Sequence, residues 1–262
     1  MDKNALPSEE LLSKYNKLKD YLASLRSVAV AFSGGVDSTF LLYAAREALG
    51  ENVTAFTASL MSFPEREMSE ALSLSDSLGV RNEVIVADEY KIEGFINNPE
   101  NRCYLCKRNI LEKIIDKAHK MEIDTVIEGS IVDDLSDDRP GHKAIKELGV
   151  ISPLIQAGLT KEEIRILSKH FSLPTYNKPS YSCLYTRIPH GDKITDEKLR
   201  MIDEAEVFIL GLGFSDVRVR FRDGSARIEV PPDETAHFTD ENVKARIDSE
   251  LKRIGFDFSK NC

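Results

Sequence analysis

The sequence has few cysteines, no long apolar run and a shortage of positive charge, and each shortage excludes a class of protein. Its 262 residues include four cysteines, too few for a disulfide scaffold of this length. No apolar run approaches the roughly 18 residues that cross a bilayer. Lys and Arg number 35 against 44 Asp and Glu, a net charge of −9. This charge argues against a protein that coats nucleic acid through bulk charge, although it leaves room for a local basic patch.

The remaining composition is that of a globular protein, with 42% hydrophobic and 30% charged residues. At about 150 residues per domain, the length favours one or two domains. The first residues lack the apolar segment of a signal peptide, so we expect a cytoplasmic protein with reduced thiols. In that compartment a Cys-x-x-Cys pair is more often a metal or redox site than a disulfide.

Hydrophobic periodicity over the first 190 residues predicts alternating strands and helices. Short apolar runs typical of buried parallel strands occupy residues 27–32, 53–58, 84–86 and 125–127. Helical patterns occupy residues 11–25, 39–49, 64–78, 106–121 and 159–171, while 133–153 is loop-rich. Such alternation predicts an α/β fold, a doubly wound parallel sheet with helices on both faces.

After Gly191 the pattern changes. It predicts an amphipathic helix, two alternating strands and a last helix, at residues 195–210, 217–221, 226–230 and 239–254. The strands flank Asp223-Gly224, which is typical of a hairpin turn. We therefore expect a nucleotide-binding domain at 1–190 and a smaller α+β helix–hairpin–helix domain at 191–262.

The hexapeptide Ser33-Gly-Gly-Val-Asp-Ser38 lies between a predicted strand and a predicted helix. Its glycines let the backbone approach a ligand, and the N–H groups and dipole of the helix favour an anion there. Asp37 would repel phosphates unless Mg²⁺ accompanies them. A plain glycine turn is the alternative. The pattern favours an ATP-binding loop formed by Ser33, Gly34, Gly35, Val36, Asp37 and Ser38, with Asp37 at the metal.

This hexapeptide resembles the pyrophosphate loop (PP-loop) of the ATP pyrophosphatases and lacks the Gly-Lys-Ser/Thr of a Walker A loop. The resemblance implies an adenine nucleotide α-hydrolase-like fold. It also implies a chemistry in which ATP is cleaved between the α and β phosphates and a poor leaving oxygen is adenylated. A nucleophile then displaces AMP.

Three cysteine thiols could act as that nucleophile or as ligands of a metal centre that supplies it. Cys103 and Cys106 lie three positions apart just before a predicted helix, and Cys183 follows much later. Three thiolates suit a 4Fe–4S cluster with one open iron, or a zinc site completed by a histidine or water. Unrelated buried cysteines are the alternative, which the basic neighbours of the first two disfavour. Cys262 is expected to take no part.

Longer stretches of the sequence indicate which family of ATP pyrophosphatases the chain resembles. Three stretches carry the resemblance: residues 128–154, which open with Glu128-Gly-Ser130; residues 178–191, which open with Lys178-Pro179; and Val217-Arg-Val-Arg220. In order and spacing, from about Leu25 to Val230, they resemble the LarE family. These ATP-dependent sulfur transferases make the nickel-pincer nucleotide of lactate racemase.

The resemblance implies adenylation of the carboxylates of pyridinium-3,5-biscarboxylic acid mononucleotide and replacement of oxygen by sulfur. Cys183 matches the family's sulfur-bearing cysteine. With Cys103 and Cys106 it matches the subgroup in which three cysteines hold a 4Fe–4S cluster whose open iron carries hydrosulfide. The implied cofactors are ATP, Mg²⁺ and this cluster. The implied partners are a sulfide donor, the other nickel-pincer cofactor enzymes and further copies of the chain, with no membrane and no nucleic acid.

The resemblance also assigns residues to the anionic groups of the substrate. These are Lys107, Thr186, Arg187, Arg218 and Arg220. The last two arginines lie two apart and can point the same way, and their forked donors suit phosphate and carboxylate. A solvated hairpin face paired with Glu229 is equally compatible.

Acidic residues offer further candidate metal ligands. Glu206 would bind a metal or contact a neighbouring subunit, and an exposed helix charge is the alternative. The acidic loop that holds Asp133, Asp134, Asp137 and Asp138 could bring Mg²⁺ or be solvated.

Three other functions remain open. A tRNA-thiolating PP-loop enzyme needs a basic surface, which the net charge disfavours. An amidating enzyme would leave three cysteines without a role. An ATP-binding module stabilised by zinc is the non-enzymatic alternative, and metal analysis separates it from an iron–sulfur protein.

Overall fold

A computed structural model describes residues 7–136, 140–179, 182–257 and 259–261. The chain forms two compact units. The first comprises Met1–Leu60, Glu65–Glu89 and Asn101–Ser180. The second comprises Met61–Pro64, Tyr90–Glu100 and Tyr181–Cys262. No helix within the described ranges has the length and apolar character to cross a membrane.

The first unit is built on a four-stranded parallel sheet of order β3-β2-β1-β4. The strands are β1 (Val28–Ala31), β2 (Val53–Ser59), β3 (Arg81–Val86) and β4 (Val126–Glu128). The helices are α1 (Glu9–Ala23), α2 (Val36–Leu49), α3 (Glu65–Ser77), α4 (Arg102–His119), α5 (Pro140–Glu147), α6 (Pro153–Gln156) and α7 (Lys161–His170). This confirms the predicted α/β fold with a parallel sheet flanked by helices.

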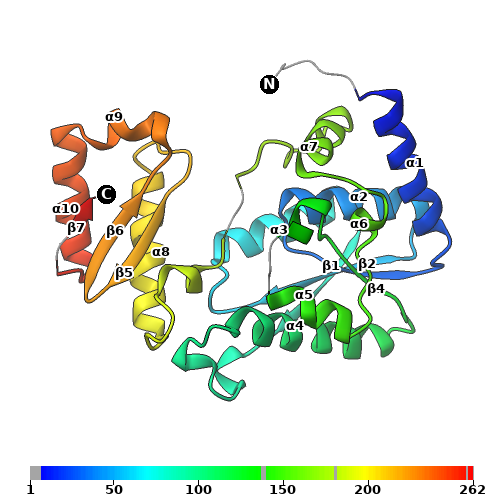
Figure 1. Ribbon diagram of the computed structural model, residues 1–262, viewed down its shortest axis with the longest axis horizontal. Coiled ribbons are helices and arrows are strands. Elements are labelled where there is room, and N and C mark those ends of the chain that lie inside the picture. The colour runs from blue at the N-terminus through cyan, green and yellow to red at the C-terminus, as the bar shows by residue number, and fades with distance from the viewer. Residues whose placement is uncertain (1–6, 137–139, 180–181, 258, 262) are drawn as a thin grey trace. The chain divides into compact units, whose positions relative to one another are not determined.

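Helices cover both faces of the sheet because each central strand is apolar on both sides. Val28 and Val30 of β1 pack into one core with α1, α2 and α7, whereas Ala29 between them faces a second core with α4 and α5. Figure 1 shows α1, α2 and α7 on one side of the strands and α4 and α5 on the other. The sheet is therefore the central layer of three.

Two local signals in the sequence are confirmed. The stripe of Leu11, Tyr15, Leu18 and Leu22 is buried on α1. The Thr160 side chain accepts from the Glu163 backbone N–H, and the Glu163 carboxylate accepts from Thr160, so the capping box opens α7.

The loop expected over 133–153 is wrong for residues 140–147, which form α5. Ala144 and Ile145 of α5 are buried, and Ile145 joins the core beside α4. Burial of these two side chains against a helix far along the chain stabilises a segment whose own pattern is too short to predict a helix.

The second unit has a three-stranded sheet of order β5-β6-β7. Its elements are α8 (Asp196–Leu210), β5 (Arg218–Arg222), β6 (Ser225–Glu229), α9 (Thr235–Phe238), α10 (Glu241–Ile254) and β7 (Ser259–Asn261). The Asp223-Gly224 turn has φ of 46° and 78°, the positive values that a tight hairpin requires. The sequence pattern did not indicate β7, which pairs in parallel with β6.

By contacts, the second unit takes in residues 90–100 as well as the segment from 181 onward, and the domain boundary near Gly191 stays a prediction. The buried Asn98 side chain donates to the carbonyls of Ile188 and Pro189, at 3.1 and 2.6 Å. The Phe95 ring packs edge-on against Tyr185. These contacts attach the cysteine-bearing segment before Gly191 to the second unit. They join positions about 90 apart, which no local pattern shows.

Candidate functional site

The Ser33–Ser38 loop runs from the end of β1 into α2, at the carboxyl edge of the parallel sheet. The sheet order reverses between β1 and β4, and ligands of such sheets bind in the crevice at that point. Gly34 has φ of +70°, and an added Cβ would lie 3.0 Å from Ala71 Cβ in α3. The geometry therefore requires glycine at this position and presents the N-terminus of α2 to an anion.

Asp37 lies in the first turn of α2, where its Oδ2 accepts a 2.5 Å hydrogen bond from Lys161 Nζ. Its Oδ1 is buried without a hydrogen-bond partner among the described residues. Burial raises the pKa of Asp37, and Lys161 opposes this effect without cancelling it. A carboxylate with one oxygen unsatisfied beside an anion-binding loop fits a ligand for the Mg²⁺ that accompanies ATP.

Glu128, the last residue of β4, is a candidate site residue that the sequence analysis did not single out, although the Glu128-Gly-Ser130 motif was visible. It is 5% exposed and accepts from the Ser130 N–H, the Ser130 hydroxyl and the Ser152 hydroxyl. Lys107 Nζ donates to it at 3.0 Å. Burial alone would raise the pKa of Glu128, but Lys107 and the serine hydroxyls outweigh it and lower the pKa.

Gly129 fixes the distance between the end of β4 and the loop. A Cβ there would lie 3.1 Å from the backbone nitrogen of Ser38 and 3.2 Å from its Cα. Both atoms belong to the backbone of α2 and cannot rotate away. Only glycine lets the end of β4 approach the first turn of α2 this closely.

Gly129→Ala is expected to weaken ATP binding about tenfold, because the methyl group displaces the N-terminus of α2. Isothermal titration with Mg·ATP measures this. Gly149→Ala is the matched control, since Gly149 has φ of +66° and open space around its Cβ position. It should lower stability by about 1 kcal/mol and leave ATP affinity unchanged. Equal ATP affinities for wild type and Gly129→Ala would show that a Cβ at this position does not displace the backbone of Ser38.

Cys103 and Cys106 lie in the first turn of α4, the former exposed and the latter half-buried. Lys107 is one turn beyond Cys103, so these two side chains share a helix face. The turn is held against α5, because the Tyr104 hydroxyl donates to Glu147 at 2.6 Å and Arg108 bonds to both. The structure thus presents Cys103 to solvent from a well-supported helix end.

Cys183 belongs to the second unit and immediately precedes the 3₁₀ turn η4 (Leu184–Arg187). Its carbonyl accepts from the Thr186 hydroxyl at 2.8 Å. The three thiols are thus divided, two in the first unit and one in the second. Within the parts of the chain that the structure describes, no group of three His, Cys, Asp or Glu side chains could hold a metal ion.

Arg187 and Glu206 pair with each other. Both side chains are 3% exposed, and Arg187 Nε and Nη2 reach the two Glu206 oxygens at 2.7 and 3.3 Å. Glu206 also accepts from the Val219 backbone N–H. Glu206 is therefore not the exposed helix charge weighed from the sequence. The ion pair joins η4 to α8, and the bond from Val219 joins α8 to β5.

Arg218 and Arg220 are half-buried on one face of β5, as their spacing predicts. Arg220 Nε donates to Glu229 Oε1 at 2.6 Å, and its Nη1 donates to the Thr186 carbonyl at 3.2 Å. Arg220 lowers the pKa of Glu229, with smaller contributions from other arginines. The face also carries Arg227, so cationic side chains exceed acidic ones on it.

Two carboxylates of the acidic loop accept hydrogen bonds from backbone N–H groups, one at the start of α7 and one within the loop. Asp133 accepts from the Lys161 N–H and Asp134 from the Ile131 N–H, each at 3.0 Å. Asp137 and Asp138 lie outside the described residues.

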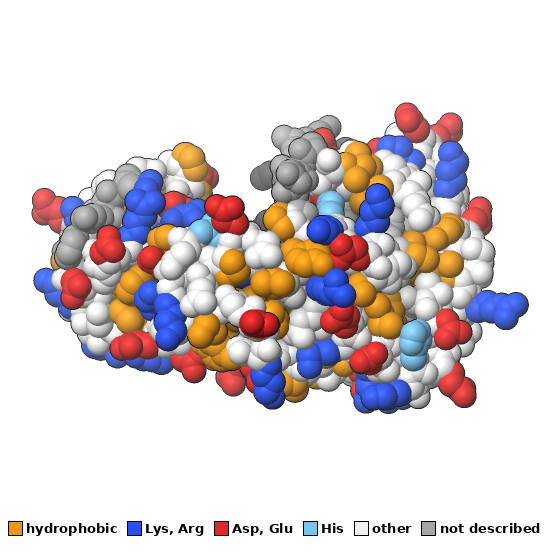
Figure 2. Space-filling model, turned by 60° about the horizontal axis from the view of Figure 1, so that its bottom comes forward, with side chains coloured by type: hydrophobic (Ala, Val, Ile, Leu, Met, Phe, Trp, Pro, Cys, Tyr) orange, Lys and Arg blue, Asp and Glu red, His pale blue; other side chains and the backbone are white. Residues whose placement is uncertain are grey.

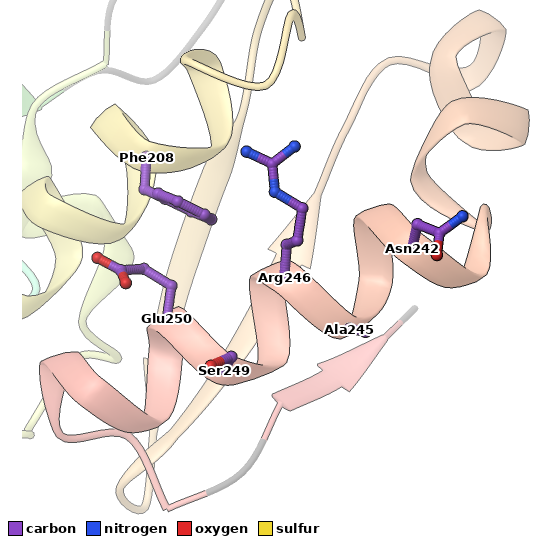
Figure 3. Close-up of a pocket in the computed structure, with 6 residues that line it drawn as sticks. All are labelled: Phe208, Asn242, Ala245, Arg246, Ser249 and Glu250. Carbon is purple, nitrogen blue, oxygen red and sulfur yellow. The ribbon is translucent and has the colours of Figure 1, made fainter.

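An open hollow of about 460 Å³ lies between α8 and α10 and contains none of the predicted site residues. In Figure 3 Phe208 extends from α8 toward the part of α10 that bears Arg246 and Glu250. Its lining is Phe208, Asn242, Ala245, Arg246, Ser249 and Glu250. We assign this hollow no part in the candidate site.

Comparison with known proteins agrees with this geometry. Residues 16–97, which hold the loop, match the asparagine synthase family. The chain is 36% identical to an uncharacterized protein, slr1717, of Synechocystis over 94% of this chain and 92% of that one. It is 34% identical to pyridinium-3,5-bisthiocarboxylic acid mononucleotide synthase of Lactiplantibacillus plantarum over 94% and 89%. It is 29% identical to an uncharacterized protein, MJ0830, of Methanocaldococcus jannaschii over 95% and 93%.

A parallel sheet with this loop at its carboxyl edge defines a PP-loop ATP pyrophosphatase. Such enzymes cleave ATP to AMP and pyrophosphate while they adenylate a substrate. At 34% identity over nearly its whole length, the chain belongs to the LarE family of pyridinium-3,5-bisthiocarboxylic acid mononucleotide synthases. It is an ATP-dependent, adenylating sulfurtransferase.

Proposed function

We propose that this enzyme converts the carboxylates of pyridinium-3,5-biscarboxylic acid mononucleotide to thiocarboxylates. The observation that carries the proposal is the Ser33–Ser38 loop, in a chain that aligns over 94% of its length with the synthase of Lactiplantibacillus plantarum. The name of that relative states a bisthiocarboxylic acid mononucleotide as its product.

In the proposed reaction Mg·ATP binds at the loop with Asp37 at the metal. A substrate carboxylate oxygen attacks the α-phosphorus, and the bond to the β-phosphate oxygen breaks and releases pyrophosphate. Sulfide then attacks the carbonyl carbon of the acyl adenylate. The C–S bond forms, the C–O bond breaks, and AMP leaves. Stabilisation of the departing phosphates by oriented N–H groups is the role that α2 suits.

The sulfur source proposed is a 4Fe–4S cluster held by Cys103, Cys106 and Cys183. Such a cluster would supply sulfide, so that no C–S bond of the protein would have to break. The exposure of Cys103 and its spacing to Cys106 on one helical turn support the donor set. Two of these ligands belong to the first unit and one to the second.

The substrate's anionic groups are proposed to bind Arg218, Arg220, Lys107 and Thr186. The excess of arginine on the β5 face supports this for the first two residues. For Arg187 and Glu206 we propose a structural role in positioning η4, because the two side chains bind each other in a buried ion pair. Their pairing positions η4, and with it Thr186 beside Cys183.

Anaerobically purified protein is expected to contain about four iron and four sulfide per chain and to form the thiocarboxylate over many turnovers when sulfide is supplied. Cys103→Ala should lose iron and repeated turnover together, because an incomplete ligand set cannot retain the cluster. Iron and sulfide analysis with mass spectrometry of the nucleotide product measures both. Zinc without iron, and no pyrophosphate release, would favour the ATP-binding module instead.

The tRNA-thiolating alternative has less support. On the face in Figure 2, Lys and Arg side chains are interspersed with Asp and Glu, and no broad basic surface forms there. A salt-dependent gel shift with tRNA would favour that alternative.

A further inference from the structure

An ion pair joins Glu128, the last residue of β4, to Lys107 of α4, and the proposed reaction gives Glu128 no role. Glu128 has a side chain 6% exposed and Lys107 one 34% exposed, joined at 3.0 Å. A buried carboxylate is retained only when donors or a counter-charge compensate for its lost hydration. Here both kinds of partner are present.

The donors around Glu128 show which partner holds the other. Its oxygens accept from the Ser130 N–H at 3.0 Å, the Ser130 hydroxyl at 2.9 Å and the Ser152 hydroxyl at 2.5 Å. Three donors from Ser130 and Ser152 thus fix the carboxylate before Lys107 is counted. The flexible lysine is the partner that gains a defined position.

The stem of Lys107 is confined as well. A Cβ on Gly141 would lie 3.2 Å from Lys107 Cδ, so α5 packs directly on the lysine chain. The ammonium has three N–H donors, and one goes to Glu128. The partly exposed group keeps donor capacity toward solvent or a ligand.

The pair lies at the same sheet edge as the loop. Glu128 is in register with Ala31, the last residue of β1 before the loop begins. The next residue, Gly129, approaches the Ser38 nitrogen closely enough that a Cβ there would be 3.1 Å from it. A cation anchored on Glu128 therefore lies at the same carboxyl edge of the sheet as the N-terminus of α2, where ligands of such sheets bind.

We propose that Glu128 is a positioning residue that holds the Lys107 ammonium against an anionic oxygen of ATP bound at the Ser33–Ser38 loop. Without the carboxylate, the lysine would spread over many rotamers and lose much of its contact with the phosphate chain. The inference rests on the proposed function and refines it, because it assigns Lys107 to the phosphates of ATP in the adenylation step rather than to the anionic groups of the pyridinium substrate.

A double-mutant cycle on Mg·ATP affinity tests this. Lys107→Met and Glu128→Gln should each weaken binding about tenfold, as loss of one charge-assisted hydrogen bond does. The double variant should be no weaker than Lys107→Met, because Glu128 acts through the lysine. Glu112→Gln is the control. It removes an exposed carboxylate that pairs with Arg108 on the same helix, and it should leave ATP affinity unchanged.

Additive losses in the double variant would overturn the proposal, and so would unchanged ATP affinity in Glu128→Gln. If Glu128→Gln does not fold, Glu128→Asp replaces it in the cycle. Asp keeps the charge but shortens the reach to Lys107, so ATP affinity should still fall and should do so only when Lys107 is present. The cycle uses ATP alone. A wild type that binds ATP but never converts the pyridinium nucleotide would contradict the proposed function and leave this inference standing.

Discussion

Asp37→Asn is expected to lower the rate of pyrophosphate release by at least about 100-fold, the scale of losing one preorganised electrostatic group. Asn keeps the shape of the side chain but offers a metal one neutral oxygen in place of a carboxylate. The rate loss should be accompanied by a higher Mg²⁺ requirement. Pyrophosphate release over a Mg²⁺ titration measures both effects.

The same substitution is expected to raise the thermal stability of the ligand-free protein at neutral pH. Burial raises the pKa of Asp37 in the folded state, so the folded protein holds this proton more tightly than the unfolded chain does. The free energy of unfolding of the wild type therefore falls as the pH rises above 3.8, the ordinary pKa of an aspartate. The Asn variant has no proton to release at this position, so it does not show this loss. Melting curves across this pH range should differ in slope between the two proteins.

Asp133→Asn is the matched control for both measurements. Asp133 accepts the Lys161 backbone N–H near the same site, and an amide oxygen can accept that bond equally well. Its rate and its Mg²⁺ requirement should stay at the wild-type level. Unchanged activity in Asp37→Asn would contradict the metal role of Asp37.

Cys183→Ser is expected to lower thiocarboxylate formation at least about a thousandfold, as removal of an essential group at the reacting centre does. Adenylation should persist, because the ATP loop belongs to the other unit. AMP and pyrophosphate should therefore still appear at the slow rate at which water hydrolyses the acyl adenylate. Product mass spectrometry alongside an AMP assay separates the two half-reactions.

Cys262→Ser is the control for Cys183→Ser and should retain full sulfur transfer. The state of Cys183 in the wild type after turnover adds a second measurement. An intact residue agrees with delivery from a cluster. Dehydroalanine at position 183 would show that the cysteine's own sulfur is consumed, and the proposed cluster mechanism would then be wrong.

The fold class and the ATP loop followed from short stretches of sequence. The apolar run before Ser33 and the helical pattern after Ser38 place the loop between strand and helix, since both signals need only neighbouring residues. The same holds for the α7 capping box and for the Asp223-Gly224 turn, whose φ values are set locally. Hydrogen bonds between residues three or four apart leave a visible pattern in the sequence.

The roles of the buried charges came from tertiary structure. Nothing local distinguishes Arg187 from an exposed arginine, and its partner Glu206 lies on another element. Glu128 and Lys107 are 21 positions apart, and their pairing depends on how β4 and α4 pack. The cost of burying a charge depends on the donors that surround it, and chain folding brings those donors together from distant positions.

The sequence by itself thus determined the class of sheet, the anion loop at its carboxyl edge and the family. Tertiary structure alone decided that residues 140–147 form a helix, that β7 extends the second sheet and that Glu128 pairs with Lys107. The physical reason is the range of the interactions. Backbone preferences and caps act within one turn, whereas burial and ion pairing depend on residues that meet only in the folded chain.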